Sequence, residues 1–301
     1  MRLGIDGREL VAGARTGIGR YVREVLRAAA ARGWRSTVYG DTRTVLADAP
    51  AGVTLTRLAA PGTRWWDQVA LPRALRRTGA DIFLSPYYKG PVAAPCPVVL
   101  TVHDLYFIGY GGRSRPLRDS ALTAAARLYA RRARAIVTAS EHSRRAVIER
   151  LEVDPSKVTT IGVAVGAEFV PTPLAAAARA RYDLGASYVL FVGNFKPHKN
   201  VDGLLFAWAS LPATLRAAHR LVLAGGDTGR RPQLEALARA LGVTASVVFP
   251  GLVGDADLPG LYSACAAFVL PSLDEGFGLP AVEAMACGAP VIGRASCRER
   301  V

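Results

Sequence analysis

Strand-like and helix-like segments alternate along almost the whole chain, and the series occurs twice. In the first half, strand-like segments cover residues 3–5, 36–39, 53–58, 81–84, 97–102 and 135–139, and helix-like segments cover residues 19–32, 65–77, 118–132 and 141–151. In the second half, strands are expected at 188–192, 220–224, 247–249 and 267–270, and helices at 201–210, 232–241, 257–264 and 279–286. Such alternation is typical of parallel sheets with helices on both faces. It predicts two doubly wound α/β domains, with ligand sites at the carboxyl ends of their strands.

The length and composition fit two domains. The chain has 301 residues, half of them hydrophobic, which is enough for two separate cores. We expect an N-terminal Rossmann-like domain at residues 1–170, a linker with room for one short helix at 171–186, and a C-terminal Rossmann-like domain at 187–301. No apolar run is long enough to span a membrane. Met1 leads directly into a strand-like segment, which leaves no room for a signal peptide. The four cysteines form no CxxC pair, which favours reduced thiols and a cytoplasmic protein.

The chain is strongly basic, with a formal net charge of +14. Arginines gather in the first half, at Arg73, Arg76, Arg77, Arg113, Arg115, Arg118, Arg127, Arg131, Arg132 and Arg134. Solvated helix faces account for most of them. A second interpretation is attraction to an anionic membrane surface, at the inner face of the membrane, or to an acidic acceptor. Nucleic acid is not an expected partner, because these clusters lack interleaved aromatic residues.

The stretch from Pro271 to Gly293 combines an anion site with two carboxylates. It reads as the end of a strand, a loop with glycines at 276 and 278, a helix and another strand. A helix that begins after such a loop offers free backbone N–H groups to a phosphate. Glu275 and Glu283 would instead accept hydrogen bonds from paired hydroxyls, as sugars present them. The combination indicates a nucleotide sugar as ligand. The alternative is that Glu275 caps the helix and Glu283 faces solvent.

This stretch closely resembles the donor-site signature of the retaining glycosyltransferases of family 4, and similarity to that family extends over residues 1–293. The resemblance implies the GT-B fold, in which two Rossmann-like domains face each other across a cleft. It also implies that Glu275 contacts the transferred sugar and that Glu283 contacts the ribose of the nucleotide. Residues 294–301 depart from the family pattern. They predict a C-terminally truncated chain with an incomplete second domain, and they leave the activity of the truncated chain open.

The remaining donor contacts come from loops that follow strands of the second domain. Two of the few lysines, Lys196 and Lys199, follow the strand at 188–192, and their compact charge suits a diphosphate. The resemblance assigns Lys199 to the diphosphate. Lys196 or His198 supplies a second contact, because this chain has Asn194 and His198 where the family often has arginine. Other expected donor contacts are Asn194, Gly225, Gly251, Gly276, Phe277, Gly278 and Leu279.

In the first domain, two loops at strand ends are candidate site segments. Gly17 and Gly19 lie in a loop that opens a helix, and the resemblance places this loop near acceptor and donor phosphates. His103 directly follows the strand at 97–102, and the resemblance places it near the transferred sugar. Ser140 is expected to cap the helix that follows it. Asp255 and Asp257 form a DxD motif, which in other proteins holds a metal on a nucleotide sugar. Here we interpret Asp255 or Asp257 as a helix N-cap, with metal binding as the minor alternative.

The sequence thus predicts a retaining hexosyltransferase. It would move a hexose from a GDP- or UDP-linked donor to a glycan or lipid-linked acceptor of cell-envelope polysaccharide synthesis. Mannose is the favoured hexose. His103, Glu275 and Lys199 are the expected catalytic residues, with neither a metal nor a further cofactor. Because no convincing nucleophile is present, we expect same-face attack, with a diphosphate oxygen accepting the acceptor's proton. The alternatives are a nucleotide-sugar epimerase of the same fold and a non-catalytic fragment that binds anionic surfaces.

Overall fold

The computed structural model describes residues 1–12, 16–46, 49–106, 108 and 116–293. It divides into two compact units, Met1–Gly162 and Val163–Val301. Each described unit contains one parallel sheet with helices on both faces, which confirms the predicted α/β, doubly wound class. The departure from the family pattern at 294–301 lies outside the described residues. The predicted linker at 171–186 packs on the second unit, where Ala178, Tyr182 and Leu184 enter the core.

The first unit is built on seven parallel strands in the order β3-β2-β1-β4-β5-β6-β7. The strands are β1 (Arg2–Asp6), β2 (Arg35–Gly40), β3 (Val53–Arg57), β4 (Ile82–Ser85), β5 (Val98–Val102), β6 (Ala135–Thr138) and β7 (Val158–Thr160). The helical segments are α1 (Gly17–Ala31), α2 (Thr63–Trp65), the π-helical segment η1 (Trp66–Ala70), α3 (Leu71–Thr78), α4 (Pro116–Arg132), α5 (Glu141–Leu151) and the 3-10 turn η2 (Pro155–Lys157).

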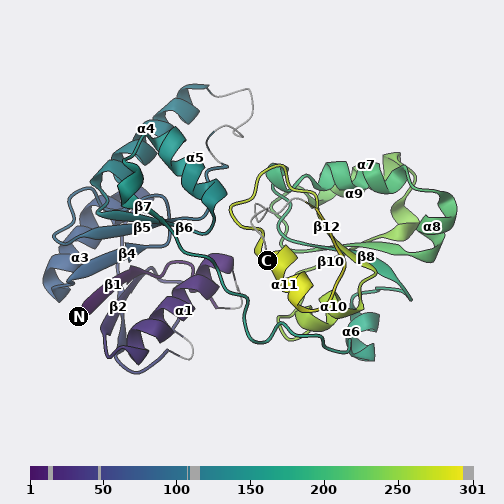
Figure 1. The fold of residues 1–301 in the computed structure, drawn as a ribbon, viewed down its shortest axis with the longest axis horizontal. Coiled ribbons are helices and arrows are strands. Elements are labelled where there is room, and N and C mark those ends of the chain that lie inside the picture. The colour runs from purple at the N-terminus through teal and green to yellow at the C-terminus, as the bar shows by residue number, and fades with distance from the viewer. Residues whose placement is uncertain (13–15, 47–48, 107, 109–115, 294–301) are drawn as a thin grey trace. The chain divides into compact units, whose positions relative to one another are not determined.

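Two apolar layers hold the helices of the first unit to its sheet. On one face, Val22 and Leu26 of α1 pack against Ile5 of β1. On the other face, the core contains residues from α3, α4 and α5 together with Phe83 and Leu100 of the sheet. Figure 1 shows α1 on one side of this sheet and α3, α4 and α5 on the other. The carboxyl ends of the central strands lead into loops, and buried Asp6 and Ser85 are the last residues of β1 and β4.

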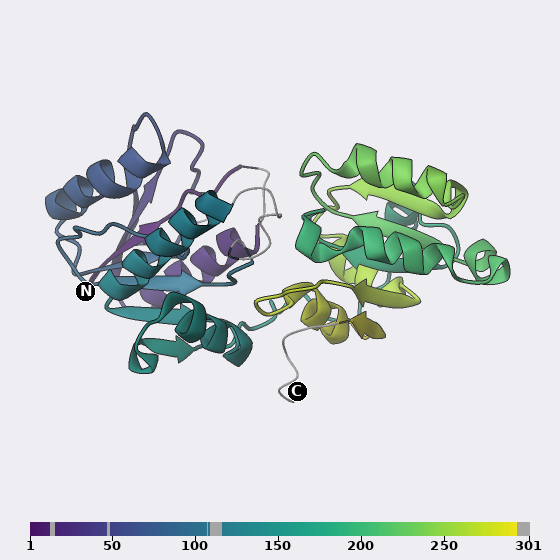
Figure 2. The ribbon, with the colours of Figure 1, turned by 90° about the horizontal axis from the view of Figure 1, so that it is seen from above.

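The second unit has five parallel strands in the order β10-β9-β8-β11-β12. They are β8 (Tyr188–Val192), β9 (Arg220–Ala224), β10 (Val247–Gly251), β11 (Ala267–Leu270) and β12 (Val291–Gly293). The helices are α6 (Ala176–Arg181), α7 (Val201–Ala209), α8 (Ala213–Ala218), α9 (Arg231–Ala240), α10 (Leu258–Ala264) and α11 (Leu279–Ala286), with short turns η3 (Pro197–Lys199) and η4 (Thr244–Ser246). One core lies under α7 and α9 and another lies under α10 and α11, and Figures 1 and 2 show these helices covering opposite faces.

Three local features differ from the sequence prediction. Strand β7 and helix α8 were not expected. β7 has three residues at a sheet edge, and none of the six residues of α8 is buried, so neither leaves a clear apolar pattern. The predicted helix at 65–77 contains a π-helical turn just before Pro72, because proline has no N–H to continue the regular ladder.

The two predicted helix caps have different outcomes. Ser140 caps α5 as expected, and its hydroxyl accepts a hydrogen bond from the N–H of Ser143 at 3.1 Å. Asp257 occupies the N-cap position of α10 but makes no capping hydrogen bond. Its carboxylate accepts from the Tyr182 hydroxyl at 2.7 Å and from Arg181 at 3.0 Å. Asp257 therefore binds the segment before β8 and does not form the expected helix cap.

Candidate active site

The order of the second sheet creates a switch point between β8 and β11. The chain moves from β8 outward to β9 and β10, and then returns to add β11 and β12 on the other side of β8. At such a point the chain connections leave the two central strands toward opposite faces of the sheet, and ligands bind in the crevice outside the carboxyl ends of these strands. Here these loops are residues 193–200, which carry the predicted lysines, and residues 271–278, which carry Glu275.

Backbone and side-chain hydrogen bonds join these two loops. The N–H of Leu273 donates to the carbonyl of His198 at 2.8 Å. The side-chain amide of Asn200 donates to the carbonyl of Pro271 at 3.1 Å. Asn200 itself adopts φ 55°, in the left-handed region that asparagine tolerates better than most residues. The loops are therefore held together before any ligand arrives.

Lys199 and Glu275 meet in this joined pair of loops. The Lys199 ammonium donates to Oε1 of Glu275 at 2.6 Å, and the Ser272 hydroxyl donates to the same oxygen at 2.6 Å. The two charged side chains are 14% and 10% exposed. The pair brings together two residues that the sequence analysis had assigned separately to the diphosphate and to the sugar. It also shows that Glu275 does not simply cap α11, because its carboxylate carries an ion pair.

Beside the pair, His198 is an uncharged neighbour. Its side chain is buried, and burial, aided by the positive charge of Lys199, lowers its pKa to about 4. The imidazole is therefore neutral at neutral pH. Lys196 is partly exposed, and its N–H donates to the side-chain oxygen of Asn194 at 3.3 Å. Of the two residues considered for a second cationic contact, His198 is therefore unsuited and Lys196 remains.

Glycines allow close backbone approach at the edges of this crevice. Gly225 follows β9 with φ 151°, and a Cβ there would lie 1.7 Å from the carbonyl oxygen of Gly193. No other residue fits this position, because the clash is with backbone. Gly278 takes φ 87° as the N-cap of α11. The loop residues Gly276 and Phe277 precede it, and Leu279 begins the helix. In the first turn Pro280 has no N–H, and the N–H of Ala281 donates to the carbonyl of Gly278 at 2.9 Å, so among the described residues Leu279 is the first-turn residue whose N–H is left for a ligand.

Glu283 lies on the inner side of α11 and not on a solvated face. It is 4% exposed, and the hydroxyl of buried Tyr262 donates to its Oε2 at 3.1 Å. The solvent-facing alternative for Glu283 is therefore wrong. Gly251 ends β10 with φ 79°, and its carbonyl accepts from the N–H of Gly225 at 2.8 Å. In the described part of the chain no group of three or more metal-ligating side chains gathers, at Asp255 and Asp257 or elsewhere.

In the first unit, the predicted loop before α1 is a capped helix start. The Thr16 hydroxyl accepts from the N–H of Gly19 at 3.0 Å. A Cβ on Gly17 would meet no atom within 4 Å, whereas one on Gly19 would lie 3.0 Å from the carbonyl of Glu9. A side chain at Gly19 would thus crowd the backbone of the segment after β1. The space beside Gly17 is open in the described structure.

His103 follows β5 and is neutral. Burial lowers its pKa to about 4, although a hydrogen bond to the carbonyl of Pro86 works in the opposite direction. Its Nε2 is buried and has no hydrogen-bond partner among the described residues, so Nδ1 is the donor to Pro86. The ring of Tyr21 contacts it edge-on, with centroids 5.4 Å apart, and the Tyr21 hydroxyl is 2.9 Å from the hydroxyl of Thr101. Nε2 is therefore set as a hydrogen-bond acceptor.

The sequence analysis missed a charged network at the switch point of the first sheet, between β1 and β4. Arg8 donates to both carboxylate oxygens of Asp6, at 3.0 and 2.6 Å, and its Nη2 lies 2.8 Å from Asp67. Lys89 lies 3.1 Å from the other oxygen of Asp67. The Arg8 guanidinium also stacks on Trp66, with its Cζ 3.8 Å from the ring centroid. We call Asp6, Arg8, Asp67 and Lys89 the Arg8 network.

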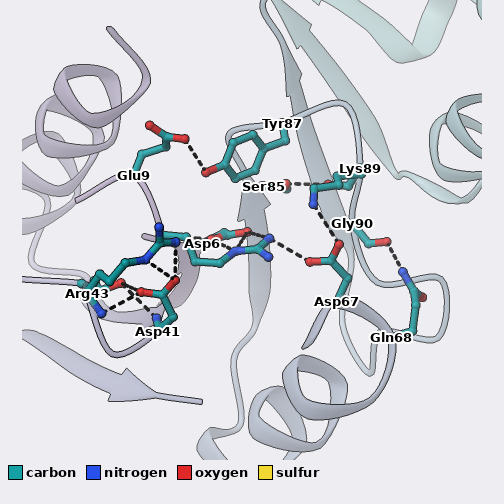
Figure 3. A network of polar contacts seen from close by, with 12 residues as sticks. Asp6, Glu9, Asp41, Arg43, Asp67, Gln68, Ser85, Tyr87, Lys89 and Gly90 are labelled. Atoms are coloured by element: carbon teal, nitrogen blue, oxygen red, sulfur yellow. Dashed lines mark hydrogen bonds and ion pairs between the residues drawn. The ribbon is translucent and has the colours of Figure 1, made fainter. Parts of the chain in front are cut away.

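Glu9 extends this polar cluster toward α1. The Tyr87 hydroxyl donates to Oε1 of Glu9 at 3.3 Å, and the Thr16 hydroxyl donates to Oε2 at 2.9 Å. Figure 3 shows Glu9 and Tyr87 beside Asp6, with Asp67 and Lys89 next to them. The loop after β1, the loop after β4 and the start of α1 therefore meet through side chains. A charged residue ending an apolar strand, as Asp6 does, is the signal that could have indicated this cluster.

Because the Arg8 network is buried, Arg8 and Asp6 strongly affect each other's pKa. Burial alone would lower the pKa of Arg8, but the hydrogen bonds and charge of Asp6 outweigh it, and the pKa is raised. The guanidinium therefore stays protonated. Burial raises the pKa of Asp6, which is 2% exposed, while the hydrogen bonds from Arg8 oppose that shift. Two buried acids and two cations balance in charge, which is the condition for keeping such groups inside a protein.

The arginine-rich segments have different locations. Arg73, Arg76 and Arg77 are exposed on α3, and Arg131 and Arg132 are exposed at the end of α4. Arg113 and Arg115 lie outside the described residues, as does the side chain of Arg118. Within the described ranges, we find no helix with the length and hydropathy that a membrane crossing needs.

Two family models match this chain, and each falls on one of the structural units. The model of glycosyltransferase family 4 matches residues 15–168, about half of the chain. The model of glycosyl transferases group 1 matches residues 178–300. The second match contains residues 193–200, which we call the lysine loop because they carry Lys196 and Lys199, and it also contains the switch point between β8 and β11 and both glutamates. The two models therefore cover the loops on which the site was built.

The chain is also similar to curated mannosyltransferases. It is 38% identical over 170 residues to the serotype-specific mannosyltransferase WbdA of Escherichia coli, a match that covers 54% of this chain and 21% of WbdA. It is 35% identical over 163 residues to the O-antigen chain mannosyltransferase B of Escherichia coli, covering 53% of this chain and 43% of that protein. The chain thus spans less than half the length of these curated relatives.

Solved structures share the fold at lower identity. WaaG, a glycosyltransferase involved in lipopolysaccharide biosynthesis, superposes with a TM-score of 0.77 at 20% identity, covering 99% of this chain and 82% of WaaG. Anabaena HepE, solved in complex with UDP and glucose, superposes with a TM-score of 0.72 at 21% identity, covering 97% and 80%. These matches show the GT-B fold. Together with the family models, they establish that the chain belongs to glycosyltransferase family 4.

Proposed function

We propose that this protein is a retaining glycosyltransferase that moves mannose from a nucleoside diphosphate sugar to a glycan or lipid-linked acceptor. The observation that carries the proposal is the Lys199–Glu275 pair at the switch point between β8 and β11. A lysine for a diphosphate and a carboxylate for sugar hydroxyls lie there within one hydrogen bond of each other. The start of α11, entered through Gly278, supplies the backbone N–H of Leu279 and the positive end of the helix dipole to the same ligand.

Donor binding exchanges the partners of this pair. The ammonium of Lys199 leaves Glu275 and binds the diphosphate, and the freed carboxylate accepts hydrogen bonds from hydroxyls of the sugar. Lys196 supplies the second positive charge, because His198 is neutral at neutral pH. The exchange costs little Coulomb energy, since each charged group gains a new partner as it loses the old one.

The nucleotide lies along the second sheet. Glu283 accepts hydrogen bonds from the ribose hydroxyls, with Tyr262 holding one carboxylate oxygen in place. Because Gly225 and Gly251 have no side chains, the nucleotide can approach the ends of β9 and β10 closely. Asn194 lies in the lysine loop beside them. The donor needs no metal in this scheme, because lysines and the start of α11 offset the charge of the leaving diphosphate.

The first unit contributes to the sugar and the acceptor. His103 is neutral, and its Nε2 is a ready acceptor for a hydroxyl hydrogen. We assign it to a hydroxyl of the transferred sugar. The open space beside Gly17, at the start of α1, gives room for phosphate groups. This assignment uses His103 as a hydrogen-bond acceptor and not as a general acid, since a group with a pKa of about 4 carries no proton to donate at neutral pH.

Transfer proceeds on one face of the sugar. The bond between the anomeric carbon and the diphosphate oxygen breaks, and the acceptor hydroxyl attacks from the same side. The departing diphosphate oxygen takes the proton of that hydroxyl, so the anomeric configuration is retained and no covalent enzyme intermediate forms. Lys199, Lys196 and the N–H of Leu279 at the start of α11 stabilise the negative charge that develops on the leaving diphosphate.

The identity of the donor rests on the relatives. Two curated relatives are named as mannosyltransferases, one serotype-specific and one of the O-antigen chain, which favours GDP-mannose as donor and a cell-envelope glycan as acceptor. A neighbour of the same fold was solved with UDP, which makes UDP-sugars the second choice. A lipid-linked acceptor would place the protein at the inner face of the membrane, where the net charge of +14 favours anionic lipids.

The proposal is tested by assaying donor hydrolysis and transfer with GDP-mannose and UDP-glucose. We expect Glu275→Ala and Lys199→Ala to lower kcat/KM roughly 100- to 1,000-fold, the usual effect of removing one transition-state contact. Arg239→Ala, on the exposed face of α9, is the matched control and should retain wild-type turnover. Equal turnover in all four proteins would overturn the proposed site. Formation of an isomerised sugar nucleotide without acceptor would instead indicate an epimerase.

A further inference from the structure

A separate hollow lies at the opposite edge of the first sheet from His103 and the Arg8 network. It has a volume of about 310 Å³ and is formed where β5, β6 and β7 begin. Arg134 immediately precedes β6, Lys157 precedes β7, and Arg131 and Arg132 end α4. The site residues described above follow the carboxyl ends of strands, whereas these residues precede the amino ends. The hollow is therefore distinct from the candidate active site within this unit.

The lining of this hollow is positively charged. It includes Arg131, Arg132, Arg134 and Lys157, and no carboxylate is among the lining residues. Arg131 makes a long 3.5 Å contact with exposed Glu152. In the described part of the chain, the side chains of Arg132 and Arg134 make no ion pair. The chain has 24 acidic residues, but none of them lines this hollow. The uncompensated positive charge favours binding of an anion from solution.

The backbone around the hollow is fixed before a ligand binds. The N–H of Arg134 donates to the carbonyl of Val98 at 2.8 Å. The Lys157 ammonium donates to the carbonyls of Arg131 and Ala133, at 2.9 and 3.3 Å. Lys157 therefore offsets the negative end of α4, which would otherwise repel an anion. One of its three hydrogens remains for a ligand.

The remaining wall is apolar. It includes Val92, Cys96 and Pro97. A second hollow, of about 530 Å³, continues along α4 past Leu128 and shares Arg131 with the first. Leu128 is 44% exposed. A ligand with a phosphate at one end and a less polar remainder matches this arrangement, because the charged wall and the apolar surface are adjacent.

The geometry points to a second anion site, which binds a phosphate or diphosphate group at Arg132, Arg134 and Lys157. The group belongs either to a free phosphorylated molecule or to the head of an anionic lipid. Arginine pairs recognise phosphate oxygens through two parallel hydrogen bonds, and two arginines free of internal ion pairs supply such contacts. The inference is independent of the proposed glycosyl transfer, because it rests on no residue of the candidate active site.

The test measures binding in full-length protein that carries Lys199→Ala, so that the proposed donor site contributes little. One arm titrates inorganic pyrophosphate by calorimetry. The other arm measures co-sedimentation with phosphatidylcholine vesicles that contain about 30% phosphatidylglycerol. Arg132→Gln/Arg134→Gln is compared with Arg76→Gln/Arg77→Gln, which removes the same charge from exposed positions on α3.

We expect the Arg132→Gln/Arg134→Gln variant to lose roughly tenfold or more in affinity, while the α3 variant stays within about twofold of the parent. Loss in the pyrophosphate arm identifies a soluble phosphate as ligand, and loss only with vesicles identifies a lipid headgroup. Equal affinity of the two variants in both arms would overturn the site, as would the absence of binding by the parent. Alkylation of Cys96, followed by peptide mapping, gives a second readout, because a bound ligand should slow it.

Discussion

The two sheets of this protein each have a switch point, and the charged groups there are arranged in opposite ways. Between β1 and β4, Arg8 is fixed by two buried acids and by the face of Trp66. Between β8 and β11, Lys199 has one ion-pair partner among the described residues, Glu275, and its side chain is 14% exposed, close to the 13% of Arg8. The first arrangement satisfies its charges internally. The second can exchange its partners for a ligand.

This difference separates a structural role from a binding role. A buried network whose charges all balance contributes to the stability of its unit, because removing one member leaves a buried charge without compensation. A single ion pair leaves each charge with one partner, so a ligand that supplies a new partner for the cation or the carboxylate can replace it. Charge at a switch point therefore does not by itself identify a ligand site.

The largest expected effect is on the stability of the first unit. Arg8→Met should lower its free energy of unfolding by about 3–5 kcal/mol, because Asp6 and Asp67 would then be buried with only Lys89 to offset them. Urea unfolding measures the change. The control is Arg2→Met, which removes an exposed pair with Asp81 and should cost about 0–1 kcal/mol. Equal losses in the two variants would mean that the Arg8 network is not a stabilising element.

A second prediction uses one neutral histidine in each unit. His103 and His198 have folded pKa values of about 4, below the ordinary 6.5. Between pH 6.5 and 4 the unfolded state binds more protons, so stability falls as the pH falls through this range. Each histidine should cost about 2 kcal/mol between pH 7 and pH 5. The His103→Gln/His198→Gln protein should lose less stability over the same range, and an unchanged pH dependence would refute the assignment.

The joined loops of the second unit give a smaller effect. Asn200→Ala removes the hydrogen bond to the carbonyl of Pro271 and places alanine at φ 55°. We expect a loss of about 1–2 kcal/mol in stability, measured by thermal unfolding. Asn200→Gly keeps the conformation accessible and should recover part of this loss. If the glycine variant were no more stable than the alanine variant, backbone strain would not explain the position.

The smallest effect is the coupling between Lys199 and Glu275 without ligand. A double-mutant cycle with Lys199→Ala and Glu275→Ala should give a coupling in the free energy of unfolding near the lower end of the roughly 0.5–3 kcal/mol typical of contacting pairs, because the pair is isolated. The same cycle with Arg8→Met and Asp67→Ala should give a clearly larger value. Reversal of this order would remove the distinction between the exchangeable pair and the fixed network.

Sequence reasoning was most accurate where the determinants are contiguous. The stretch around Glu275 could be interpreted because a strand end, glycine loop, helix and second glutamate follow one another within a short segment. The element pattern predicted both sheets for the same reason. It missed β7 and α8, which are short and carry little apolar periodicity.

The missed network depends on contacts between distant residues. Asp67 lies in η1 and Lys89 follows β4, so folding brings both of them close to Arg8 and no local pattern specifies this; Asp6 is only two residues from Arg8. The burial of Glu283 also depended on a distant partner, Tyr262. By contrast, Lys199 and Glu275 were each identified locally, but their ion pair required the neighbouring positions of β8 and β11.

The most direct test of the central claim is nucleotide binding at the second switch point. Calorimetric titration of GDP and UDP into the wild-type protein, Lys199→Ala and the control Arg239→Ala measures it. We predict that Lys199→Ala weakens the Kd of the preferred nucleotide by roughly 10- to 100-fold, the loss of one charge-assisted contact, while the control binds as the wild type does. Equal Kd values for Lys199→Ala and the wild type would contradict the placement of the diphosphate on the Lys199–Glu275 pair.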